Sequence, residues 1–136
     1  MNEIINEIHK NINKSNNNRN FQKEMDRLIE KNQRKGIIPT LFLHSCCAPC
    51  SSYVLEYLSQ YFKITVYYYN PNIYPPEEYE ERTMEVERLI RELPAKYPIS
   101  FISGEYRPEL FYEAVKGHEG DKEGGERCSI CFSLRL

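Results

Sequence analysis

The sequence predicts an α/β fold built on a parallel sheet. Three short apolar segments with strand character alternate with segments in which apolar residues recur at helical spacing. Proline, glycine and asparagine residues separate them. The order of helix, strand, helix, strand, helix, strand and helix is typical of crossover connections between parallel strands. A chain of 136 residues is long enough for one modest core.

The first part of the chain is polar. Residues 1–20 are rich in Asn and Lys, so we expect a flexible N-terminal arm, with an RNA-contacting arm as the alternative. From Phe21 to Lys35 apolar residues recur at helical spacing, Asn20 can cap this helix and Gly36 can end it. We therefore place the α/β domain at residues 21–136.

The remaining elements follow at regular intervals. The predicted strands are apolar or β-branched, and the first is apolar on both faces, as in a buried parallel strand; they cover residues 37–43, 62–69 and 98–102. The predicted helices cover residues 50–60 and 77–93 and begin again at Pro108 and Cys128. Because parallel strands end at one edge of a sheet, Cys46, Cys47 and Asn70 are expected to share that edge.

Charge and hydropathy narrow the class of protein. The net charge of −2 gives no global basic field for nucleic acid, although a local patch is compatible with it. No segment approaches the ~18 apolar residues of a membrane span, and the first residues lack a signal-peptide pattern. We expect a cytoplasmic protein with no membrane partner. Clustered cysteines in that compartment indicate metal ligands or redox thiols.

All five cysteines lie in two groups, Cys46-Cys47-Ala48-Pro49-Cys50 and Cys128-Ser129-Ile130-Cys131. Cys47, Cys50, Cys128 and Cys131 could bind zinc as two pairs, but most of a domain separates the pairs and Cys46 stays unexplained. Vicinal thiolates suit a multi-iron cluster, because it offers several metal corners. Cys47-Ala48-Pro49-Cys50 between a strand and a helix also fits a thioredoxin-like dithiol oxidoreductase. Buried core cysteines are the fourth reading that spacing leaves open.

A longer pattern surrounds these cysteines. Leu43-His44-Ser45-Cys46-Cys47-Ala48-Pro49-Cys50 resembles the opening motif of the QueH-type epoxyqueuosine reductases. The likeness continues through Tyr69-Asn70-Pro71-Asn72-Ile73-Tyr74-Pro75, Glu78-Tyr79 and Arg82, then Gly125-Glu126-Arg127-Cys128-Ser129-Ile130-Cys131 and Leu134-Arg135-Leu136. It implies a three-layer, Rossmann-like or nucleotide-hydrolase-like parallel sheet. It also implies a [4Fe–4S] cluster held by Cys46, Cys47, Cys128 and Cys131, with Cys50 as a neighbour.

The resemblance further implies reduction of epoxyqueuosine to queuosine at the wobble position of tRNA, with electrons from an unknown donor. The leaving oxygen must be activated by an additional metal ion or by a positioned acid. Spacing singles out no catalytic residue among the candidate donors or ligands, which are His44, Tyr69, Tyr74, Glu78, Tyr79 and Asp121. The alternative from another class is a noncatalytic, zinc-stabilised α/β binding module.

One departure from the family pattern concerns length. Family members continue for several dozen residues and carry a Cys-x-Cys pair there, which these 136 residues lack. The chain also stops within what looks like a helix, so we expect a truncated domain. In such a domain cluster binding is expected to persist more readily than turnover.

Overall fold

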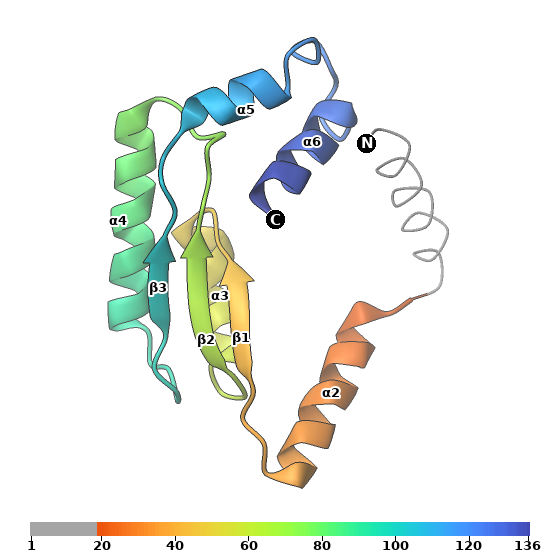
Figure 1. Cartoon of the computed structure of the whole chain (residues 1–136). Coiled ribbons are helices and arrows are strands. Elements are labelled where there is room, and N and C mark those ends of the chain that lie inside the picture. Colours follow the sequence, from red (N-terminus) through yellow and green to blue (C-terminus); the bar gives the residue numbers. More distant parts are fainter. Residues whose placement is uncertain (1–18) are drawn as a thin grey trace. The chain divides into compact units, whose positions relative to one another are not determined.

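The computed structural model describes residues 19–136. One compact unit ends at Ile37 and the second spans Ile38–Leu136. All but the last two residues of the predicted arm at 1–20 lie outside the described residues, so the arm and its boundary remain predictions. The described elements are α2 (Phe21–Lys35), β1 (Thr40–His44), α3 (Ala48–Leu58), β2 (Lys63–Tyr68), α4 (Pro76–Glu92), β3 (Ser100–Ser103), α5 (Pro108–Ala114) and α6 (Glu126–Arg135) (Figure 1). None of these helices is long and apolar enough to cross a membrane.

Helix α2 begins and ends where the sequence predicts. The side chain of Asn20 accepts a hydrogen bond from the backbone N–H of Lys23 at 3.0 Å, which satisfies one of the free donors of the first turn. Gly36 has a φ of 65°, a left-handed conformation that glycine adopts at little cost. Both caps are therefore local features of the sequence and need no tertiary contact.

The three strands form a parallel sheet in the order β1-β2-β3, which confirms the predicted α/β class. Leu43 pairs with Val66, and Val66 pairs with Phe101. Right-handed crossovers place α3 and α4 on the same face of the sheet, and these two helices contact each other. The largest fully buried side chains of this core include Leu55, Ile64, Val66, Tyr68 and Val86.

The first strand differs from the prediction in burial. β1 lies at an edge of the sheet, and its Phe42 side chain is 64% exposed and stacks on Tyr67 with ring centroids 5.3 Å apart. Ile102 on β3 is also exposed. The prediction that β1 is buried on both faces is therefore wrong within Ile38–Leu136, because α3 and α4 cover one face only. The central strand, β2, holds the buried residues.

Some elements begin at residues other than those that the sequence predicts. β1 begins at Thr40, since Pro39 has no N–H to donate and only its carbonyl joins the sheet, accepting from Lys63 at 3.0 Å. α6 begins at Glu126 rather than at Cys128. Cys128 and Cys131 are therefore both within a formed helix, three residues apart, which places them on one face.

Candidate functional site

The segment after β1 carries the vicinal cysteines. The Ser45 N–H donates to the carbonyl of Tyr67 at 3.1 Å, so the sheet pairing extends to the residue just before Cys46. Cys47 has extended backbone angles and is the N-cap of α3. The Sγ atoms of Cys46 and Cys47 are 3.9 Å apart, and all five thiols are free. The adjacent thiols are thus held at the carboxyl edge of the sheet.

The loop after β2 is hydrogen-bonded to the segment that carries the vicinal cysteines. Asn70 is buried, and its Nδ2 donates to the carbonyl of Ser45 at 2.9 Å. His44 Nε2 lies 2.9 Å from the carbonyl of Tyr69 and donates to it in the matching tautomer. These two bonds join the loops after β1 and β2 and confirm the expected shared edge. His44 and Asn70 act here as structural residues.

Helix α6 brings the second pair of thiols. Cys128 Sγ accepts from the Gly124 N–H at 3.2 Å, and Cys131 Sγ accepts from Arg135 Nη1 at 3.7 Å. The positive charge of Arg135 also acts on Cys46 and opposes the rise in the pKa of that thiol. Arg135 therefore lies beside a thiol at the sheet edge, Cys46, and a thiol on α6, Cys131, which are 85 residues apart in sequence.

The thiols of the first motif have unequal proton affinities. Burial, followed by the charge of Cys47, raises the pKa of Cys46, while Arg135 opposes that rise. Burial also acts to raise the pKa of Cys47, but hydrogen bonds from the Cys50 backbone and side chain and from Cys46 outweigh it, so the pKa is lowered. The hydrogen bond to Cys47 and its charge raise the pKa of Cys50. Cys47 is therefore the thiol of this motif that ionises most readily.

The donor set fits a multi-metal group better than a single ion. Among residues 19–136, no three of the five thiols come close enough together to ligate one ion. A tetrahedral zinc site requires four such convergent donors. An iron–sulfur cluster spreads its cysteine ligands over separate metal corners, so adjacent and distant thiols can each take one. Two thiols lie at the sheet edge and two lie on α6, so the cysteines are distributed over two places rather than gathered at one point.

A depression of ≈ 320 Å³ opens beside Cys47. Its lining comes from Cys47 and Pro49 on one side and from α4 on the other, with residues Glu78, Glu81, Arg82 and Glu85. Arg82 Nε pairs with Glu78 Oε1 at 2.6 Å, and the charge of Arg82 also helps to lower the pKa of Cys47. The first turns of this acidic helix thus border the cysteine site.

The structure singles out no catalytic acid among the other candidate donors. Tyr79 is buried and stacks on Tyr106 with ring centroids 4.0 Å apart, which is a packing role. Tyr74 is 68% exposed and contacts Tyr112 edge-on. Tyr69 stacks on Tyr67 of β2, with ring centroids 6.0 Å apart.

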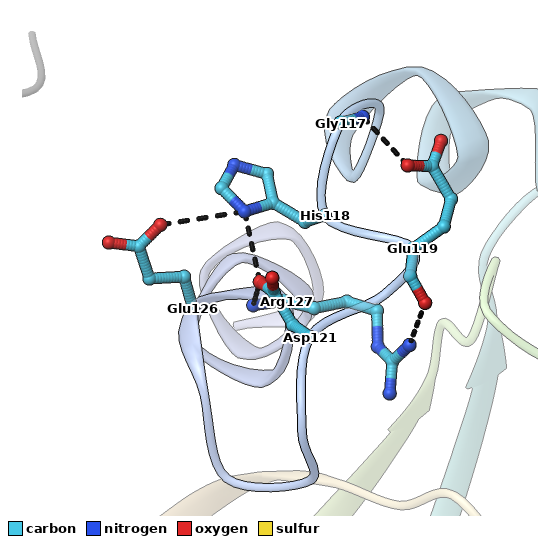
Figure 2. Close-up of polar contacts among 6 residues, drawn as sticks. All are labelled: Gly117, His118, Glu119, Asp121, Glu126 and Arg127. Carbon is cyan, nitrogen blue, oxygen red and sulfur yellow. Dashed lines mark hydrogen bonds and ion pairs between the residues drawn. The ribbon is translucent and has the colours of Figure 1, made fainter.

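Asp121 has a definite partner set, shown in Figure 2. Its Oδ2 accepts from His118 Nδ1 at 2.9 Å and from the Arg127 N–H at 3.1 Å. Glu126 Oε2 lies 3.4 Å from the same His118 nitrogen. The His118 nitrogen and one carboxylate oxygen each from Asp121 and Glu126 lie within 4.8 Å of one another. Asp121 thereby satisfies a free N–H in the first turn of α6, which carries Cys128.

We expect Asp121→Ala to lower the free energy of unfolding by about 1 kcal/mol, as for loss of a helix cap. Urea unfolding of both chains provides the measurement. Glu123→Ala is the matched control, because it removes the same charge from the same loop, and Glu123 makes no polar contact that the described residues reveal. Equal stability of the Asp121 and Glu123 variants would contradict the capping role.

Sequence reasoning missed Arg135 and Arg82 as neighbours of the thiols. Both arginines belong to the family motifs quoted above. Arg135 lies four residues after Cys131, and Arg82 lies four residues after Glu78. Residues at that spacing face each other on a helix. That Arg135 also reaches Cys46 depends on tertiary packing, which no local pattern reports.

Comparison with known proteins identifies relatives of this chain. A family model described as epoxyqueuosine reductase QueH matches residues 41–136. A protein named epoxyqueuosine reductase QueH from Streptococcus pyogenes serotype M1 is 38% identical over 119 residues, covering 86% of this chain and 47% of that protein. Proteins of the same name from Staphylococcus aureus (strain Mu50) and Haemophilus influenzae (strain KW20) are 41% and 43% identical over 121 and 97 residues. These alignments cover 86% and 71% of this chain and 50% and 38% of the two proteins. The chain spans about half the length of the first two.

Proposed function

Because the chain belongs to the epoxyqueuosine reductase QueH family, we propose that it acts in the reduction of epoxyqueuosine to queuosine in tRNA. The observation that carries this proposal is the pairing of the family match with the two linked thiol groups, Cys46-Cys47 at the sheet edge and Cys128 with Cys131 on α6. We place the protein in the cytoplasm, since free clustered thiols suit a reducing compartment and the proposed substrate is a tRNA.

The proposed cofactor is a [4Fe–4S] cluster. Cys46, Cys47, Cys128 and Cys131 are the proposed ligands, and Cys50 is a neighbour that hydrogen-bonds to Cys47. Support comes from the spread of the thiols, which suits several metal corners rather than one ion. When bound, such a cluster supplies the reaction with single electrons.

The proposed reaction removes the epoxide oxygen as water and leaves an alkene, which consumes two electrons and two protons. This chain contributes the fixed ligand frame, with Asn70 and His44 holding the two strand-end loops together. The depression beside Cys47 is the proposed approach for the nucleoside, since it is open and borders a proposed ligand. The electron donor is proposed to be a separate reductant.

The test is to purify the chain without oxygen, reconstitute it with iron and sulfide, and analyse its metal content. We expect a brown protein with about four iron and four sulfide ions per chain. The reduced protein, incubated with tRNA that carries epoxyqueuosine, should then give queuosine in nucleoside mass spectrometry, and Cys46→Ala should give none. A colourless chain that binds one zinc ion tightly would contradict the reductase proposal and favour the zinc-stabilised module.

A dithiol oxidoreductase is the second candidate function. It is favoured by one observation: Cys47 is the N-cap of α3 and hydrogen-bonds to Cys50, as in a redox-active Cys-x-x-Cys pair. Intact-mass analysis after mild oxidation tests it. A reversible disulfide between Cys47 and Cys50 in a metal-free chain that takes up no iron would support this candidate over the cluster.

A further inference from the structure

Arg135 is a positively charged side chain that lies near thiols of both cysteine groups. Its Nη1 donates to Cys131 Sγ at 3.7 Å, and its positive charge also acts on the thiol of Cys46. One planar group therefore lies close enough to act on a thiol from each of the two cysteine groups. A guanidinium suits this position, because its five N–H donors point in fixed, divergent directions and its charge persists at any physiological pH.

The charge of Arg135 is not balanced by the protein. Within residues 19–136, no carboxylate lies within 4.0 Å of it, and its Nε is buried with no hydrogen-bond partner. Arg82, the other arginine near these thiols, is paired with Glu78 at 2.6 Å. A buried donor without a partner is costly, so its position calls for an anionic acceptor.

Resting on the proposed function, we infer that Arg135 is the charge-compensating residue of the cluster. It donates a hydrogen bond to the proposed ligand sulfur of Cys131, its charge acts on that of Cys46, and its buried Nε is the donor left for an anionic acceptor. Thiolate ligands and sulfides carry a net negative charge, which grows by one on reduction. A positive charge and N–H donors beside the sulfurs stabilise the reduced state and raise the reduction potential.

Two substitutions separate charge from shape. Arg135→Met keeps much of the side-chain volume and removes the charge and all donors. Arg135→Lys keeps the charge and a donor but loses the planar fork. Arg88→Gln is the control, because it removes a charge from an arginine that is 70% exposed and paired with Glu92 on α4. The 136-residue chains are reconstituted without oxygen, and iron content and midpoint potential are measured by a titration followed by electron paramagnetic resonance.

We expect Arg135→Met to lower the equilibrium constant for reduction at least tenfold, a shift of about 59 mV to more negative potential for one electron. Loss of iron in Arg135→Met with retention in Arg135→Lys would support the inference equally, since Lys keeps the positive charge and an N–H donor and Met keeps neither. An unchanged potential in Arg135→Met with full iron content overturns it. So do equal defects in Arg135→Met and Arg135→Lys, because charge would then not be the operative property. If the parent chain takes up no cluster, the proposed function and this inference fail together; in the other two contrary outcomes the proposed function stands.

Discussion

Cys46→Ala should abolish binding of the proposed iron–sulfur cluster, whereas Cys50→Ala should leave the iron content close to that of the parent chain. The reason lies in the contacts of the two thiols. Cys46 is half-buried and shares the guanidinium of Arg135 with Cys131 on α6. Cys50 is exposed and contacts Cys47. Of these two residues, Cys46 is the one on which the arginine bonded to Cys131 acts.

The measurement is iron and sulfide per chain after anaerobic reconstitution, together with the visible absorption band. Loss of one of four ligands is expected to reduce the iron content at least tenfold after gel filtration, since structural metal binding depends steeply on a complete ligand set. Cys50→Ala is the matched control, because it removes the same atoms three residues from Cys47. Full iron retention in Cys46→Ala, or equal loss in Cys50→Ala, would refute the assignment of Cys46 as a ligand and Cys50 as a neighbour.

Local patterns were enough to predict most of the fold. Asn20 and Gly36 give the limits of α2 because capping depends on the residues themselves. The parallel sheet follows from the alternation of strands and helices, and the sharing of one edge by Cys46 and Asn70 follows from strand direction. These features need no knowledge of which residues meet across the chain.

What the sequence did not predict depends on tertiary placement. The exposure of Phe42 is set by the edge position of β1, which hydrophobicity does not reveal, since an apolar strand has the same composition at the edge as in the centre. The approach of Arg135 to Cys46 is set by the tertiary position of α6, which packs against α5 and is far from Cys46 in sequence. The sequence therefore identified Arg135 as part of a family motif, but it did not predict that Arg135 lies near two thiols.

Asn70→Asp should destabilise the chain strongly at neutral pH, by more than Asn70→Ala. The buried amide of Asn70 donates to the Ser45 carbonyl at 2.9 Å, directly before Cys46. Alanine leaves that carbonyl without its donor, at a cost of about 1–3 kcal/mol. An ionised aspartate has the same shape, but it adds a desolvated charge that faces the carbonyl oxygen, so the cost is larger. The loop that carries Cys46 and Cys47 loses its anchor in both variants.

The pH dependence distinguishes this cause from a simple loss of packing. Burial raises the pKa of an aspartate at position 70 in the folded chain above its unfolded value of about 3.9, so the folded state binds the extra proton. The variant should therefore lose stability relative to the parent as pH rises from the unfolded pKa through the raised folded pKa. At lower pH the protonated carboxyl can donate to the Ser45 carbonyl and restore the bond. Urea unfolding of the parent, Asn70→Ala and Asn70→Asp across this range is the measurement. A stability difference between parent and Asn70→Asp that does not change with pH would mean that no charge is buried there, and that Asn70 contributes volume rather than a donor to the cysteine loop.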